Sequence, residues 1–208
     1  MSLKENEAYF SRARVVPVLT PESVASGVAV SRVLFEAGLR MQEITLRTEW
    51  GLDTIAALTR ELPGLIVGAG SVVTPELGEA AIRAGAGFLV SPGTNDTLLQ
   101  FAADCRVPFL PGVSTVSESM RVLALGCSAA KLFPADLLGG AAFLRAVAGP
   151  LPFMKFCPSG GVDARIAPDY LRLANVLAVG GSWMAPAELI RQNRFDDIRQ
   201  LAEQAASL

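Results

Sequence analysis

The chain has 208 residues, of which 51% are apolar, and a formal net charge of −2. This length and apolar content suit one domain with a large core, so we expect residues 1–208 to form a single domain. The weak net charge and the scattered arginines argue against nucleic acid as a partner, and no apolar stretch approaches the roughly 20 residues that span a bilayer.

The amino-terminal residues, Met1 to Glu7, are polar and lack the apolar segment of an export signal. Cys105, Cys127 and Cys157 are odd in number, widely spaced and surrounded by apolar residues. Such usage is typical of reduced core thiols in the cytoplasm rather than of a disulfide framework. Because zinc sites need close cysteine pairs or histidines, and the chain has no histidine, we expect no metal site.

One unit recurs along the chain: a short apolar strand, a turn rich in Gly, Ser, Thr and Pro, and an amphipathic helix. A lead-in helix is expected from about Asn6 to Ala13. The predicted strands are Val15–Leu19, Met41–Thr45, Leu65–Ala69, Phe88–Ser91, Phe109–Val113, Ala129–Phe133, Phe153–Pro158 and Val176–Gly180. The predicted helices are Pro21–Ala37, Trp50–Leu62, Pro75–Ala84, Asn95–Cys105, Val116–Leu125, Gly140–Val147, Ile166–Leu173, Ala185–Gln192 and Asp196–Ala206.

Helix ends carry their usual signals. Threonine followed by proline, which pairs an N-cap with a first helical residue, occurs at Thr20-Pro21 and Thr74-Pro75. Glycines that can end a helix in the left-handed conformation follow four predicted helices, at Gly38, Gly64, Gly85 and Gly126.

Short, almost wholly apolar strands separated by helices are typical of a parallel sheet that is covered on both faces. Eight such units predict an α/β fold, a (β/α)8 TIM barrel with a short N-terminal lead-in helix. The alternative is an open doubly wound sheet. The barrel is favoured because there are eight units and because no Gly-x-Gly-x-x-Gly motif opens the first helix.

Lys131 is the most informative residue, because it lies in the apolar run Ala129-Ala130-Lys131-Leu132-Phe133-Pro134 of a chain with three lysines. Apolar surroundings disfavour an ammonium group and so favour the neutral amine, which is a nucleophile. This indicates imine chemistry on a carbonyl substrate. The alternative is a structural lysine, and Lys155 is a competing buried lysine that lies further from the carboxyl end of its strand.

Glu43 is the expected partner of Lys131. Interior side chains of a barrel form layers from alternate strands, so the second and sixth strands can share a layer. The carboxylate would then serve as an ion-pair partner or as an acid and base for the steps that follow imine formation.

Two glycine-rich turns follow the last two strands, Ser159-Gly160-Gly161 and Gly180-Gly181-Ser182. Barrels often bind phosphate with these two loops, because glycines let backbone amides approach the oxygens. The simpler interpretation is that each glycine pair only makes a tight turn. Two pairs after adjacent strands favour a phosphate site.

Several of these segments together resemble the 2-keto-3-deoxy-6-phosphogluconate (KDPG) aldolases. They are Glu43-Ile-Thr-Leu-Arg47-Thr48, Gly68-Ala-Gly-Ser71, Ser91-Pro-Gly93, Pro111-Gly-Val-Ser-Thr115, Lys131-Leu-Phe-Pro-Ala135, Cys157-Pro-Ser-Gly-Gly161 and Gly180-Gly-Ser-Trp183. The resemblance implies a class I aldolase without metal or cofactor, usually a homotrimer. Its implied partners are small molecules, a phosphorylated keto acid and pyruvate.

The resemblance also implies roles for individual residues. Lys131 would be the Schiff-base lysine and Glu43 the general acid and base. The other implied contacts are Arg47 and Ser71 with the substrate carboxylate, Pro92 and Phe133 with the pocket wall, Ser159 with substrate hydroxyls, and Gly160, Gly161, Gly181 and Ser182 with phosphate. Ser71 and Ser159 stand where family members often have threonine, which leaves the substrate preference open.

Two other functions stay in competition. One is a sister aldolase that acts on 4-hydroxy-2-oxoglutarate or on 2-keto-3-deoxy-6-phosphogalactonate through the same lysine and carboxylate. The other is a phosphosugar isomerase, epimerase or non-catalytic phosphate-binding barrel in which Lys131 forms no imine. Metal-dependent epimerases of this fold recruit histidines, which this chain lacks.

Overall fold

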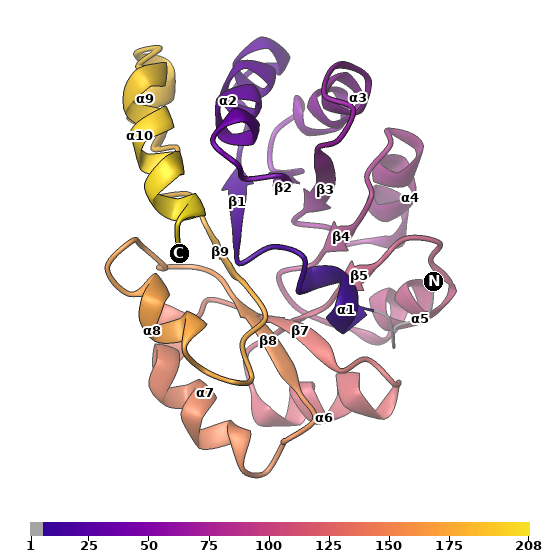
Figure 1. Cartoon of the computed structure of the whole chain (residues 1–208). Coiled ribbons are helices and arrows are strands. Elements are labelled where there is room, and N and C mark those ends of the chain that lie inside the picture. The colour runs from indigo at the N-terminus through magenta and orange to yellow at the C-terminus, as the bar shows by residue number, and fades with distance from the viewer. Residues whose placement is uncertain (1–5) are drawn as a thin grey trace.

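The chain forms a closed ring of parallel strands with helices on the outside (Figure 1), in a computed structural model that describes residues 6–208. One side of the ring has the order β5-β4-β3-β2-β1-β9 and the other has β6-β7-β8. Only Pro111 separates β5 from β6, and a bridge between Ser159 and Gly180 joins the end of β8 to β9. The predicted (β/α)8 barrel is therefore confirmed.

The strands are β1 Val15–Leu19, β2 Met41–Thr45, β3 Ile66–Gly70, β4 Leu89–Val90, β5 Phe109–Leu110, β6 Gly112–Val113, β7 Ala129–Leu132, β8 Lys155–Pro158 and β9 Val179–Gly181. The helices are α1 Asn6–Phe10, α2 Val24–Glu36, α3 Gly51–Glu61, α4 Pro75–Arg83, α5 Asp96–Asp104, α6 Val116–Ala124, the 3₁₀ helix η2 Asp136–Leu138, α7 Gly140–Ala148, α8 Ala167–Leu171, α9 Ala187–Arg191 and α10 Phe195–Ala206.

The fifth strand position is divided into two short strands. The sequence predicts one strand over Phe109–Val113, but the structure has β5 and β6 on either side of Pro111. Proline has no backbone N–H and cannot donate to a ladder. As a result β5 pairs with β4, while β6 pairs with β7.

Helix α2 begins later than predicted. Thr20 does not cap it; the cap is Ser23, whose side chain accepts a hydrogen bond from Ser26 N–H at 3.1 Å. The Thr20 hydroxyl instead lies 2.9 Å from that of Thr45 at the end of β2. The second predicted cap, Thr74, is confirmed at α4. Gly38, Gly85 and Gly126 directly follow the C-caps of α2, α4 and α6 with positive φ values, which confirms them as glycines that end helices. Gly64 also has a positive φ but lies two residues after Leu62, the C-cap of α3, so the prediction is wrong there.

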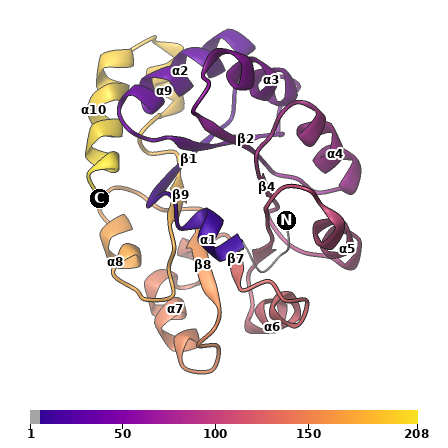
Figure 2. The same ribbon diagram turned by 45° about the vertical axis from the view of Figure 1, so that its right-hand side comes forward.

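Helix α1 lies at the centre of the ring of outer helices, over the amino-terminal ends of the strands (Figure 2). It ends at Phe10, three residues before the predicted end at Ala13. Phe10 is 2% exposed and its ring packs edge-on against that of Phe88 inside the barrel, with centroids 5.5 Å apart. Asn6 donates a hydrogen bond to the Phe109 carbonyl. These contacts close one end of the barrel, as expected for the lead-in helix.

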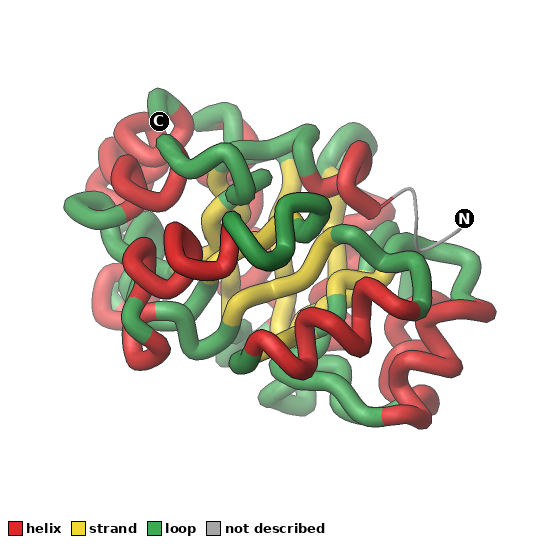
Figure 3. The backbone as a smooth tube through the Cα atoms, turned by 90° about the horizontal axis from the view of Figure 1, so that it is seen from below, coloured by secondary structure: helices red, strands yellow, loops and turns green. Residues whose placement is uncertain are grey.

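Two apolar clusters fill the molecule. The larger one lies between the strands and the surrounding helices, whose backbones Figure 3 shows from below. The smaller one lies inside the ring and includes Met41, Phe88, Leu110 and Ala129. Among residues 6–208, no helix combines the length and the apolar character needed to cross a membrane. The sequence predicts no export signal within Met1 to Glu7. Residues 1–5 of that segment lie outside the described residues.

Candidate active site

Lys131 and Glu43 meet inside the barrel. Lys131 comes from β7 and Glu43 from β2, and the amine nitrogen lies 3.0 Å and 3.3 Å from the two carboxylate oxygens. Both residues are buried, with exposed fractions of 5% and 4%. The contact confirms that the second and sixth strand positions share an interior layer. The Lys131 ammonium and the Glu43 carboxylate are shielded from water and pair with each other. Such pairing allows charged groups to remain in a protein interior.

A glycine on the neighbouring strand makes room for the carboxylate. Gly70 ends β3 beside Thr45 of β2, and a Cβ atom at this position would collide with Glu43 Oε1. Gly70 belongs to the motif Gly68-Ala-Gly-Ser71, but this role is not among those predicted for it. A signal was available, because Gly68 and Gly70 are two residues apart and therefore face the same side of a strand.

Two neighbours define the environment of the amine. The Phe133 ring lies beside it, with its centroid 5.5 Å from Lys131 Nζ. Cys157 is the β8 partner of Lys131 in the sheet register. Burial raises the pKa of the Cys157 thiol to about 12, an effect that the nearby Lys131 charge opposes only in part. The thiol therefore stays protonated, as expected for a buried core cysteine.

Arg47 and Ser71 lie together at the carboxyl ends of β2 and β3. Arg47 Nε donates a hydrogen bond to Ser71 Oγ at 2.9 Å. Ser71 has a φ of 60°, an unusual left-handed conformation for a residue other than glycine. The planar guanidinium that this contact orients can hold a carboxylate through two hydrogen bonds.

A cavity of about 160 Å³ opens above Lys131 at the carboxyl ends of the strands. Its wall contains all four predicted phosphate residues and three others from the predicted site: Gly160, Gly161, Gly181, Ser182, Arg47, Phe133 and Ser159. Gly161 has a φ of 80°, and a Cβ atom there would collide with Asp136 of η2. A second, smaller space below the cavity contains Glu43, and both spaces reach Lys131 and Ser159.

Pro92 and Lys155 do not line the two spaces beside Lys131. Pro92 lines neither space beside Lys131; its backbone packs against Gly112 instead, so close that a Cβ atom on Gly112 would collide with it. Lys155 starts β8 and donates a hydrogen bond to the Ala174 carbonyl at 2.9 Å. That position, two residues before Cys157, places it away from the carboxyl ends of the strands and agrees with a structural role.

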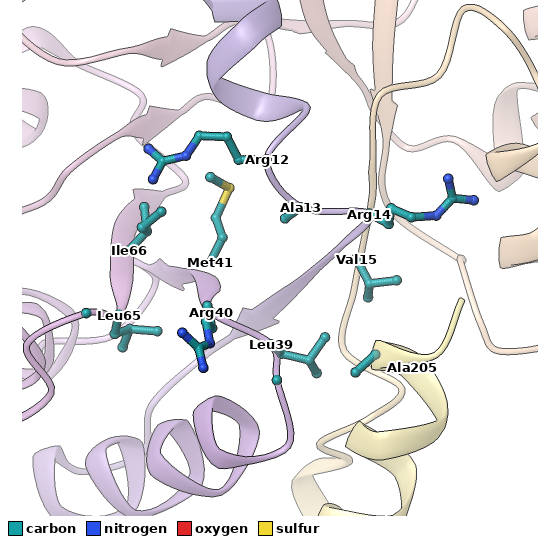
Figure 4. A pocket seen from close by; sticks show the side chains of 13 residues that line it. Arg12, Ala13, Arg14, Val15, Leu39, Arg40, Met41, Leu65, Ile66 and Ala205 are labelled. Carbon is teal, nitrogen blue, oxygen red and sulfur yellow. The ribbon is translucent and has the colours of Figure 1, made fainter.

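A larger cavity, about 610 Å³, lies at the opposite end of the barrel (Figure 4). Arg12, Arg14 and Arg40 line it, but the guanidinium groups of Arg12 and Arg14 point away from each other. Arg14 Nε donates to the Leu208 carbonyl at 3.0 Å, just after α10 ends. A cation near a helix carboxyl terminus offsets the helix dipole, so Arg14 stabilises the end of α10.

Comparison with known proteins gives one consistent result. The family model described as KDPG and KHG aldolase matches residues 7–201. The 2-dehydro-3-deoxy-phosphogluconate aldolase of Pseudomonas aeruginosa is 44% identical over 193 residues, which cover 93% of this chain and 88% of that protein. The KHG/KDPG aldolase of Escherichia coli K12 is 40% identical over 199 residues, covering 96% and 93%.

A solved structure agrees with these relatives. KDPG aldolase from Legionella pneumophila, with pyruvate captured at low pH as a covalent carbinolamine intermediate, superposes with a TM-score of 0.94. The sequences are 35% identical, and the match covers 97% of this chain and 98% of that one.

Proposed function

This chain belongs to the KDPG and KHG aldolase family, and on that basis we propose that it is a class I aldolase that cleaves KDPG to pyruvate and glyceraldehyde 3-phosphate. The observation that carries the proposal is the buried contact of 3.0 Å between Lys131 and Glu43 beneath an open cavity. An amine that a carbonyl substrate can reach, with a carboxylate in hydrogen-bond contact, is the minimum that imine chemistry requires.

The first half of the reaction forms the imine. Transfer of a proton from Lys131 to Glu43 along their hydrogen bond leaves a neutral amine and a neutral acid. The amine attacks the keto carbon of the substrate and forms a carbinolamine. Glu43 then returns the proton to the departing hydroxyl, water leaves, and a protonated imine remains.

The second half breaks the carbon–carbon bond. The positive imine withdraws electrons from the C3–C4 bond of the substrate, while Glu43 accepts the proton of the C4 hydroxyl. Glyceraldehyde 3-phosphate leaves, and the resulting enamine takes a proton at C3. Hydrolysis of the imine releases pyruvate and restores the amine.

The residues around Lys131 would hold the two ends of the substrate. Arg47, oriented by Ser71, would bind the carboxylate next to the keto group, and Ser159 would contact the hydroxyls. The glycine turns at Gly160 and Gly181 would present backbone amides to the phosphate. Ser71 and Pro92 both line neither space beside Lys131. Ser71 is kept because it binds Arg47, whereas the Pro92 side chain has no polar group that could do so.

Borohydride trapping tests the imine directly. With pyruvate and borohydride, we expect a stable adduct on the peptide that contains Lys131, identified by mass spectrometry. Lys131→Ala should abolish the adduct, whereas the matched variant Lys155→Ala should leave it unchanged. An adduct on Lys155, or none on the unaltered protein, would contradict the proposal.

A sister activity on 4-hydroxy-2-oxoglutarate is the second candidate, because the Escherichia coli relative is a KHG/KDPG aldolase. The two candidates differ in their need for phosphate. If the glycine turns bind phosphate, Ser182→Asp should raise KM for KDPG by charge repulsion and leave KM for 4-hydroxy-2-oxoglutarate unchanged. If Ser182→Asp raised KM equally for both substrates, Ser182 would not be a phosphate-binding residue.

We further propose that residues 1–208 act as one catalytic domain and assemble as a homotrimer. Exposed apolar side chains near α6 are consistent with an interface: Val116, Met120 and Leu125 are 37%, 56% and 50% exposed. Light scattering should give the mass of three chains. A mass of one chain at micromolar concentration would refute the trimer.

A further inference from the structure

The peptide group between Pro111 and Gly112 links the backbone of Lys131 to Ser91, the residue that follows β4. The carbonyl of Pro111 accepts a hydrogen bond from Lys131 N–H at 2.8 Å. The N–H of Gly112, on the other side of the same peptide bond, donates to the hydroxyl oxygen of Ser91 at 3.1 Å. A peptide group is planar and rigid, so a shift at its Ser91 side moves its Lys131 side as well.

The Ser91 hydroxyl takes the place of a backbone acceptor. Ser91 N–H still donates to the Leu110 carbonyl at 3.2 Å, which continues the pairing of β4 with β5. One residue later the chain turns away at Pro92. Since β6 is paired in register with β7, the Ser91 hydroxyl ties this half-strand back to the fourth strand position.

The surroundings of this bond are closely packed. Ser91 is 0% exposed, and the backbone of Pro92 and Gly93 packs directly on Gly112. If the hydroxyl were removed, the buried N–H of Gly112 would have to find another acceptor by moving the chain. Such a movement would be passed to Lys131 through the Pro111 carbonyl.

We propose that Ser91 is a positioning residue that holds the Lys131 backbone where its amine meets the substrate. The inference rests on the proposed imine chemistry and adds a residue that contacts neither the substrate nor Lys131 itself. Placement matters because reacting groups need near-attack geometry, and a displacement of about 1 Å can cost about 100-fold in rate.

The test is the single-turnover rate of pyruvate trapping by borohydride, with saturating pyruvate, for the full-length protein and three variants. Ser91→Ala should lower the rate roughly tenfold or more. Ser91→Cys keeps the shape but is a weaker acceptor, and its rate should lie between those of Ser91→Ala and the unaltered protein. These rates are measured well below the melting temperature of each variant.

Ser119→Ala is the matched control. Ser119 is 1% exposed, and its hydroxyl donates to the Thr115 carbonyl at 2.9 Å in α6, outside the barrel. Both alanine variants should lose stability, but Ser119→Ala should trap pyruvate at the normal rate. Normal trapping by Ser91→Ala, or equal slowing by both alanine variants, would overturn the inference. Absence of trapping by the unaltered protein would instead refute the proposed function.

Discussion

The Glu43 carboxylate contacts the Lys131 amine through both of its oxygens. In the proposed reaction, this contact would let one carboxylate take up the amine proton and serve the later proton transfers in turn. The pair is also a point of structural weakness. Removal of one partner of a buried ion pair costs about 3–5 kcal/mol, since the remaining charge has no counterion.

Glu43→Gln tests the proton-transfer role, and it also removes the counterion of Lys131. The amide keeps nearly the same shape and still accepts a hydrogen bond, but it cannot take up a proton. We expect kcat for KDPG cleavage to fall by about 10²- to 10⁴-fold, the usual contribution of a general acid and base. Circular dichroism and thermal melting would show whether the variant is folded. A folded variant with normal kcat would exclude Glu43 as the proton carrier.

Arg47→Lys tests the carboxylate subsite. Lysine keeps the charge but lacks the planar fork and the donor that binds Ser71, so KM for pyruvate-forming substrates should rise by about tenfold or more. Arg60→Lys is the control, because Arg60 pairs with Glu61 on the surface and its side chain is 73% exposed. Equal KM values for the two variants would show that Arg47 does not bind the substrate.

At this scale the sequence predicts residues whose chemistry is conspicuous in their context. Lys131 could be found because charge is rare in an apolar strand, whereas the role of Arg47, two residues after β2, was implied only by the family resemblance. Gly70 and Ser91 could not be assigned their roles in this way. Gly70 acts by lacking a side chain. The role proposed for Ser91 depends on the turn at Pro92 and on the division of the fifth strand position into β5 and β6.

Helix α6 is held at its start by a reciprocal cap. Glu118 Oε2 accepts hydrogen bonds from Ser114 N–H at 2.7 Å and Thr115 N–H at 2.9 Å, while the Thr115 hydroxyl accepts from Glu118 N–H. Burial tends to raise the pKa of Glu118, but the hydrogen bonds from Ser114 and Thr115 outweigh it and leave the pKa below the ordinary value of 4.5. Ionised Glu118 therefore stabilises the folded protein.

The cap gives stability a defined pH dependence. A carboxylate with a lowered pKa stabilises the fold above its ordinary pKa, and this contribution is lost as pH falls through the lowered value. Glu118→Gln should therefore melt below the unaltered protein at neutral pH, and the difference should shrink at pH values well below 4.5. Glu79→Gln, which removes a surface pair with Arg83, should change little at either pH. A pH-independent difference for Glu118→Gln would refute the role of its charge.

Whole elements are predicted well where the hydrophobic period and the end signals agree. The bounds of β1 and β2 coincide with their predictions, and α4 begins at the predicted Thr74 cap. The start of α2 is predicted wrongly because Thr20 and Ser23 both resemble caps, and only the barrel shows that the Thr20 hydroxyl is used by Thr45. The division of the fifth strand position depends likewise on which neighbour each half pairs with.

Across the whole molecule, α1 closes one end of the barrel (Figure 2). The cavity above Lys131 opens at the other end. Phe10 is the side chain that fills the closed end. Phe10→Ala should lower the free energy of unfolding by about 3–5 kcal/mol, because it leaves a cavity among packed rings. Leu137→Ala is the control, since Leu137 is 83% exposed and its removal should cost less than about 0.5 kcal/mol. Denaturant unfolding measures both values, and a loss for Phe10→Ala as small as that of the control would mean that α1 does not seal the barrel.

Cys157 lies next to Lys131 across the sheet, so two nucleophilic atoms share the interior of the barrel. With the pKa of the thiol at about 12, roughly one molecule in 100,000 carries a thiolate at neutral pH. In the proposed reaction, the protonated thiol would leave Lys131 as the nucleophile for an entering keto acid. Burial alone would then keep the neighbouring sulfur unreactive, without any group that blocks its approach.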